Sequence, residues 1–161
     1  MHLPARGGPH SNRHVTNEEI RCEMRSRTRA IAAERGEKSR AICRAIASHP
    51  AFTGSRFIAV FDPLPIEPDI LELLPAAAGR CCFPRVVDPG LEFARVLALN
   101  DLTPVGWHPT IREPAAGARL VPPEEIGLIL VPGLAFTRSG LRLGRGGGFY
   151  ELPEILSRAG A

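Results

Sequence analysis

Arginines and glycines are concentrated between residues 139 and 151, in the string Ser-Gly-Leu-Arg-Leu-Gly-Arg-Gly-Gly-Gly-Phe-Tyr-Glu. The glycines at 146–148 have no Cβ, so their backbone N–H groups can close around an anion, and a helix beginning there would add its positive N-terminal end. Arg142 and Arg145 contribute fixed positive charge with forked donors. This stretch therefore predicts a site for phosphate groups.

Neither common nucleotide signature accounts for this loop. It lacks the Gly-Lys-Ser/Thr ending of a P-loop, and Phe149 stands where a Gly-x-Gly-x-x-Gly motif read from Gly144 needs its last glycine. A tight turn would also explain three consecutive glycines. The residues on either side favour the functional interpretation.

The apolar segment at residues 126–136, Ile-Gly-Leu-Ile-Leu-Val-Pro-Gly-Leu-Ala-Phe, runs into the loop. The combined string through Tyr150 resembles the signature of the 5-formyltetrahydrofolate cyclo-ligases, also called methenyltetrahydrofolate synthetases. That signature is a Pro-Gly-x-Ala-Phe element followed by Gly-x-Arg-Leu-Gly-x-Gly-x-Gly-Tyr-Tyr. The matching residues are Pro132, Gly133, Ala135, Phe136, Gly140, Arg142, Leu143, Gly144, Gly146, Gly148 and Tyr150.

Weaker similarities to the family follow in the same order: residues 66–69 (Ile-Glu-Pro-Asp), 83–85 (Phe-Pro-Arg), Trp107, and 111–114 (Ile-Arg-Glu-Pro). The resemblance implies a ligase of one-carbon metabolism that uses ATP and Mg²⁺ to close 5-formyltetrahydrofolate to 5,10-methenyltetrahydrofolate, with release of ADP and phosphate. The γ-phosphoryl group would pass to the formyl oxygen, after which the N10 amine attacks and phosphate leaves. Such a transfer needs positioning and positive charge more than a protein nucleophile.

The family's functional positions map onto three parts of this sequence. Arg145 and Tyr150 are the implied catalytic residues, and Glu151 is the implied metal ligand. Asp62, Glu67 and Trp107 are the implied substrate-binding residues. The implied ATP-binding residues are Arg21, Arg25, Leu143, Gly144, Arg145, Gly146, Gly147, Gly148, Phe149, Tyr150 and Glu151.

Each of these residue types also has a simpler structural explanation. Arg145 could be a surface charge beside a turn, and Trp107 could be a packing residue. Glu67 stands near an expected helix start, where acids are favoured as caps. Arg21 and Arg25 could belong to a solvated helix face.

The sequence departs from the family pattern in the signature and at its end. Thr137 and Glu151 replace aspartates that the family usually has, and Pro153 falls near the start of the helix expected after the loop. The usual C-terminal strands, with a further metal-binding carboxylate, are not expected in this sequence. A truncated or non-catalytic folate- or nucleotide-binding homologue is therefore an alternative, and a small RNA-binding module is a third, disfavoured by an aromatic content of only 6%.

Composition indicates one domain. The 161 residues, 44% hydrophobic and 23% charged, suffice for a single core. We expect residues 1–17 to be a disordered tail or extension and 18–161 a single cyclo-ligase-like domain. With no membrane-length apolar run and no apolar signal segment at the start, a cytoplasmic protein is expected. The resemblance implies 5-formyltetrahydrofolate and ATP as small-molecule partners rather than nucleic acid or membrane, and a monomer is expected.

Hydrophobic periodicity predicts helices from residue 18 and over about 37–48 and 68–78, with strands at 56–61, 80–83, 91–99 and 127–131. The strand at 80–83 is expected to stop at Pro84, the strand at 127–131 to be central, and residues 100–123 to be mainly loop. This order predicts an α/β fold with a three-layer arrangement, a mostly parallel sheet flanked by helices, and the resemblance implies a phosphosugar isomerase-like fold. Ligands are then expected beyond the carboxyl ends of the strands, where Asp62, Arg85 and the glycine-rich loop emerge.

The four cysteines form no Cys-x-x-Cys pair, and we expect them to be buried thiols. The adjacent Cys81 and Cys82 should point to opposite faces of their strand. The histidines His10 and His14 lie in the expected tail, and no histidine is assigned as a metal ligand.

Overall fold

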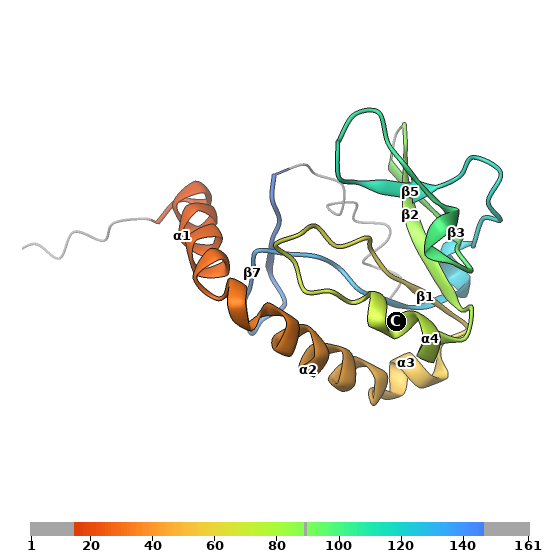
Figure 1. The fold of residues 1–161 in the computed structure, drawn as a ribbon, viewed down its shortest axis with the longest axis horizontal. Coiled ribbons are helices and arrows are strands. Elements are labelled where there is room, and N and C mark those ends of the chain that lie inside the picture. Colours follow the sequence, from red (N-terminus) through yellow and green to blue (C-terminus); the bar gives the residue numbers. More distant parts are fainter. Residues whose placement is uncertain (1–14, 89, 147–161) are drawn as a thin grey trace, which may run out of the picture.

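The computed structural model describes residues 15–88 and 90–146. Within these ranges it has a four-stranded sheet with helices and two small two-stranded sheets (Figure 1). None of the described helices combines the length and the apolar character that crossing a membrane would require.

The two N-terminal helices form where the periodicity predicts them. Helix α1 (Asn17–Ala30) begins one residue before the predicted start, because Thr16 and Glu19 form a capping box in which each side chain accepts the other's backbone N–H, at 3.2 and 2.8 Å. A 3₁₀ turn (Ala32–Glu34) leads into α2 (Arg35–Ala47), and the short α3 (Pro50–Gly54) follows. Helix α1 contains no fully buried residue, so little packing fixes it to the rest of the fold.

The helix predicted over 68–78 is shorter than expected. It comprises a 3₁₀ turn η2 (Leu71–Leu73) and one turn of α-helix, α4 (Leu74–Ala77). Pro75 has no N–H to continue a hydrogen-bond ladder, so a longer helix would be interrupted there. The chain leaves α4 through Ala78, which is left-handed with φ 49°.

The main sheet has the order β3-β2-β1-β6, formed by β1 (Phe57–Ala59), β2 (Cys81–Val87), β3 (Gly90–Arg95) and β6 (Ile126–Ile129). Strand β1 is parallel to both β2 and β6, and β3 is antiparallel to β2. This arrangement confirms the predicted α/β class with a mostly parallel sheet. The central position predicted for residues 127–131 is wrong for the sheet that the described residues form, because β6 lies last in its order and only its first residue is buried.

Pro84 does not end its strand, contrary to the prediction, because β2 continues to Val87. Pro84 lies opposite Phe93 of β3, whose carbonyl oxygen accepts a hydrogen bond from Val121 on the far side, at 2.8 Å. Pro84 and Phe93 therefore form a non-hydrogen-bonded pair of the antiparallel ladder, in which the N–H and C=O groups of each residue point away from the other. Strand β3 thus needs no N–H donor at Pro84.

The remaining strands are short. Strands β4 (Leu102–Pro104) and β5 (Arg112–Pro114) pair antiparallel within the predicted loop region, and β7 (Ala135–Phe136) pairs with β8 (Arg142–Leu143) ahead of the glycine-rich loop. A third 3₁₀ turn (Leu99–Asp101) precedes β4, and a fourth (Pro123–Glu125) precedes β6.

The core divides between the two faces of the sheet. Helices α2, α3 and α4 cover one face (Figure 1), where Cys81 and Phe83 pack with Ile58. Cys82 packs on the other face with Phe93, as the predicted alternation requires. Burial raises the pKa of the Cys81 thiol to about 11 and that of Cys82 to about 12.

Three of the four cysteines are buried as predicted, but Cys22 is exposed, so the prediction is wrong there. Cys22 belongs to α1, which has no fully buried residue on any of its faces.

Candidate functional site

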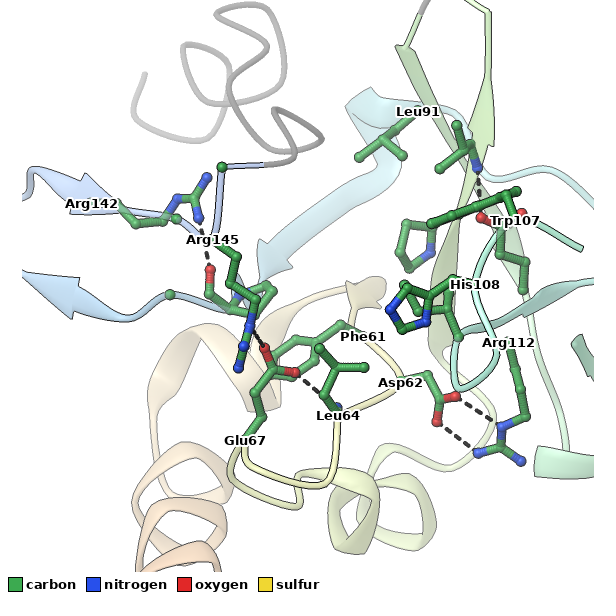
Figure 2. A pocket seen from close by; sticks show the side chains of 18 residues that line it. Phe61, Asp62, Leu64, Glu67, Leu91, Trp107, His108, Arg112, Arg142 and Arg145 are labelled. Atoms are coloured by element: carbon green, nitrogen blue, oxygen red, sulfur yellow. Dashed lines mark hydrogen bonds and ion pairs between the residues drawn. The ribbon is translucent and has the colours of Figure 1, made fainter. Parts of the chain in front are cut away.

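A cavity of about 270 Å³ opens beyond the carboxyl end of β1. Its wall is largely apolar, with Phe61 and Leu64 in the middle, and polar side chains gather at two ends (Figure 2). The arginine-bearing loop and Glu67 form one end. Asp62, Arg112 and the two rings of Trp107 and His108 form the other. A cavity of this kind suits an elongated ligand with a polar group at each end.

Arg145 and Glu67 form an ion pair at the first end, with 3.0 Å between Nε of Arg145 and Oε1 of Glu67. The other carboxylate oxygen of Glu67 accepts the backbone N–H of Leu64 at 2.9 Å. Glu67 thus closes the 64–67 turn and caps no helix, whereas Asp69 accepts the Leu71 N–H at the start of η2. Because Glu67 is only 11% exposed and held by two donors, it fixes the direction of the Arg145 guanidinium.

Asp62 and Arg112 form a bidentate pair at the second end, with distances of 2.8 and 2.7 Å from Nε and Nη2 to the two carboxylate oxygens. Asp62 lies just beyond β1 and is 7% exposed, while Arg112 belongs to β5 and is 36% exposed. Hydrogen bonding to Asp62 raises the pKa of Arg112, although burial opposes this. The pair connects the small β4–β5 sheet to the end of the main sheet.

Trp107 and His108 lie in the loop between β4 and β5. Their rings meet edge to face, 6.0 Å apart with 65° between the planes. Trp107 is 51% exposed, so it does not serve as a core packing residue. An indole presented to solvent at a cavity can bind a flat ring by stacking.

The structure brings Arg21 to the glycine-rich loop but not Arg25. Nε of Arg21 donates to the carbonyl oxygen of Gly144 at 3.1 Å, and its guanidinium also pairs with Glu18. Arg25 pairs with the same glutamate at 3.3 Å, and neither arginine lines the cavity. Since Arg21 lies one turn before Arg25, the two occupy similar helix faces, which the sequence alone does not separate.

The part of the glycine-rich loop that the structure describes lines the cavity with three consecutive residues, Gly144, Arg145 and Gly146. Gly146 has φ 104°, a conformation that side-chain-bearing residues rarely adopt. Arg142 also lines the cavity, and its Nη1 donates to the carbonyl oxygen of Pro132 at 2.9 Å. Leu143 lies in β8 and is absent from the cavity wall. The predicted residues Gly147, Gly148, Phe149, Tyr150 and Glu151 lie outside the described residues.

The described residues contain no cluster of metal-binding side chains. Among residues 15–88 and 90–146, no three acidic, histidine or cysteine side chains come together as a metal site. Three carboxylates line the cavity: Asp62 and Glu67 are each bound by an arginine, and Glu113 accepts the backbone N–H of Val86 at 3.3 Å. The predicted ligand Glu151 lies beyond the described part of the chain.

Arg85 does not emerge at the end of its strand, contrary to expectation. It lies within β2, forms an ion pair with Glu92 of β3, and is not part of the cavity. The continuation of β2 past Pro84 explains this error. Conversely, Arg112 and His108 belong to the site without having been assigned to it. Arg112 lies within the Ile-Arg-Glu-Pro similarity, which was the available signal.

Fold and cavity together define an α/β protein with an arginine- and glycine-bearing loop at one end of an apolar site and exposed rings at the other. The family model for the 5-formyltetrahydrofolate cyclo-ligase family matches residues 13–158. The chain belongs to this family of enzymes.

Individual relatives agree with this assignment. The 5-formyltetrahydrofolate cyclo-ligase of Mus musculus is 28% identical over 146 residues, covering 82% of this chain and 70% of the mouse protein. The NMR structure of Aquifex aeolicus 5,10-methenyltetrahydrofolate synthetase superposes with a TM-score of 0.75 at 28% identity, over 91% of this chain and 75% of that one. The Mycoplasma pneumoniae 5,10-methenyltetrahydrofolate synthetase shares the fold, with a TM-score of 0.65 at 18% identity, over 89% and 79% of the two chains.

Proposed function

We propose that this protein catalyses the ATP-dependent closure of 5-formyltetrahydrofolate to 5,10-methenyltetrahydrofolate, with release of ADP and phosphate. The observation that carries the proposal is a single cavity that joins the signature loop, through Gly144 and Arg145, to the exposed indole of Trp107. A reaction between a nucleotide and a pterin needs both kinds of surface in one site. Family membership supplies the reaction type.

The first step assigned to this site is attack of the formyl oxygen on the γ-phosphorus, with cleavage of the bond to the ADP oxygen. Arg145 would bind the transferring group, because beyond the Nε bond to Glu67 its guanidinium has further N–H donors that no described residue accepts. The lone pair of N5 becomes part of an iminium as the formyl oxygen is phosphorylated. N10 then attacks the formyl carbon and loses its proton. The phosphate leaves with the C–O bonding electrons and takes up that proton.

Asp62, Glu67 and Trp107 would orient the pterin, since carboxylates accept hydrogen bonds from its N–H groups and an indole stacks on its ring. Mg²⁺ bound with ATP would neutralise phosphate charge, and Glu151 is its proposed ligand. Tyr150 stays a proposed site residue on the family motif alone.

A spectroscopic turnover assay tests the proposal. The purified chain, with 5-formyltetrahydrofolate and Mg-ATP, should form the methenyl product, and Arg145→Ala should lower kcat about 100-fold, the typical cost of removing one preorganised transition-state donor. Arg138→Ala is the matched control, because Arg138 is exposed in the β7–β8 turn and does not line the cavity. It should leave kcat unchanged.

The assay separates the proposal from its alternative. A folded wild-type chain that binds both substrates without turnover would instead be a binding-only homologue. Turnover unaffected by Arg145→Ala would refute the role assigned to this arginine. The RNA-binding alternative is weakened in α1, because three of the four arginines of this helix, Arg21, Arg25 and Arg27, pair with glutamates of the same helix.

A further inference from the structure

A second groove adjoins the cavity on the side of helix α2. Its volume is about 540 Å³, and it shares Asp62, Glu67, Leu64 and Arg112 with the cavity wall. The groove extends to the first turn of α2, where Arg35 lines it. The two hollows are therefore bordered by the same residues, and a ligand that extends past them would enter the groove.

The size of the cavity favours such an extension for a folate. Pockets that enclose a whole drug-sized ligand usually measure about 300–1,000 Å³. The cavity, at about 270 Å³, lies just below that range, and the groove offers room for the part of the molecule that extends beyond it. A folate consists of a pterin, a p-aminobenzoyl spacer and a glutamate, and the glutamate carries the negative charge at the far end.

Arg35 has the unmet hydrogen-bonding capacity that such a tail would satisfy. Its Nε is buried and has no hydrogen-bond partner among the described residues. Its Nη1 donates to the carbonyl oxygen of Pro65 at 2.5 Å, which holds the guanidinium beside the 64–67 turn. A buried N–H without an acceptor is unfavourable, and a ligand carboxylate would remove that penalty while meeting an already positioned guanidinium.

The other charges of the groove are already largely engaged. Asp62 is paired with Arg112, and Glu67 is paired with Arg145. Asp69 accepts the Leu71 N–H and opposes an anion nearby. Within the described residues Arg35 forms no ion pair with a carboxylate, so it is the cation of the groove that can receive one.

We infer that the groove binds the glutamyl tail of the folate substrate, with Arg35 pairing with a tail carboxylate. This inference rests on the proposed function, since it assumes that the pterin occupies the adjoining cavity. It makes Arg35 a specificity-determining residue for folates that carry a charged tail.

The test compares two ligands on three proteins by calorimetry, with turnover measured in parallel. The ligands are 5-formyltetrahydrofolate and an analogue in which an uncharged benzamide replaces the benzoylglutamate. The proteins are wild type, Arg35→Ala, and Arg44→Ala, an exposed arginine of the same helix outside the groove. Arg35→Ala should weaken folate binding about tenfold, as expected for a charged hydrogen bond partly opposed by Asp69, and leave analogue binding and the KM for ATP unchanged.

The ligand comparison gives each outcome a meaning. Equal losses for the folate and the analogue would assign Arg35 a purely structural role and overturn the inference. No loss for either ligand, or a loss of ATP affinity instead, would overturn it as well. Binding with the expected tail dependence but without turnover would refute the proposed reaction while supporting the groove assignment. Failure of wild type to bind either ligand would overturn both.

Discussion

Removal of Arg112 should destabilise the fold more than removal of a surface arginine that also pairs with a carboxylate. In Arg112→Ala, the Asp62 carboxylate loses the two hydrogen bonds that Nε and Nη2 of Arg112 donate to it, while its side chain is only 7% exposed. Breaking a fully buried pair costs about 3–5 kcal/mol, and Arg112 is itself over one-third exposed, so we expect about 2 kcal/mol. For a chain of this size that lowers Tm by about 4–8 °C.

The assay is urea denaturation followed by circular dichroism and by tryptophan emission. The chain has a single tryptophan, Trp107, and it lies in the loop that ends at the strand bearing Arg112. Emission should therefore also report a local change in the native baseline. Arg56→Ala is the matched control: Arg56 is 71% exposed and lies 3.4 Å from Glu125, and its loss should cost under about 1 kcal/mol.

A double-mutant cycle decides whether the pair itself is responsible. Asp62→Asn combined with Arg112→Ala should lose clearly less than the sum of the two single losses, because the second change no longer strands a charge. Strict additivity, or an Arg112→Ala loss no larger than that of Arg56→Ala, would refute the reasoning.

Three further predictions concern close packing and thiol chemistry. Gly127→Ala should lower the free energy of unfolding by about 2 kcal/mol through overpacking, because an added Cβ would lie 2.6 Å from Oγ and 3.0 Å from Cβ of Ser55. Thermal melts measure this loss, and Gly117→Ala, where an added Cβ meets open space, should be neutral in them. A thiol reagent at pH 8 should label Cys22 in the native protein and Cys82 only after unfolding; labelling of both at one rate would contradict the burial described. The folded protein keeps the Cys82 proton up to a pKa of about 12, whereas the unfolded chain loses it from its ordinary value of 9.0, so this thiol should make stability fall as pH rises above about 9.

The sequence predicted the elements best where one periodic pattern was enough. Helices α1 and α2 and the strands of the main sheet occur where periodicity placed them, and Cys81 and Cys82 alternate between faces as a strand requires. The predictions were wrong where a residue distant in the sequence determines the local structure. Pro84 stays within a strand because of how Phe93 faces it, and that pairing is not encoded near Pro84.

The candidate site was predicted where a motif existed. The loop residues Gly144 and Arg145 line the cavity with Asp62 and Glu67, four positions that the family resemblance assigns to the site, and their roles in binding and catalysis stay predictions. Arg112 was missed as a site residue, because its pairing with Asp62 joins positions 50 residues apart that no local pattern relates. Which turn of α1 reaches the loop was also undetermined, since charged residues recur along the whole helix.

The bond between Arg21 and Gly144 joins two points 123 residues apart in the chain. During synthesis α1 leaves the ribosome early, without a buried face of its own to hold it, and its partner carbonyl must still be made. At about 5–20 residues per second, that partner follows roughly 6–25 s later. The helix that the proposed ATP site uses is thus among the first segments translated and, by this contact, among the last to find its place in the fold.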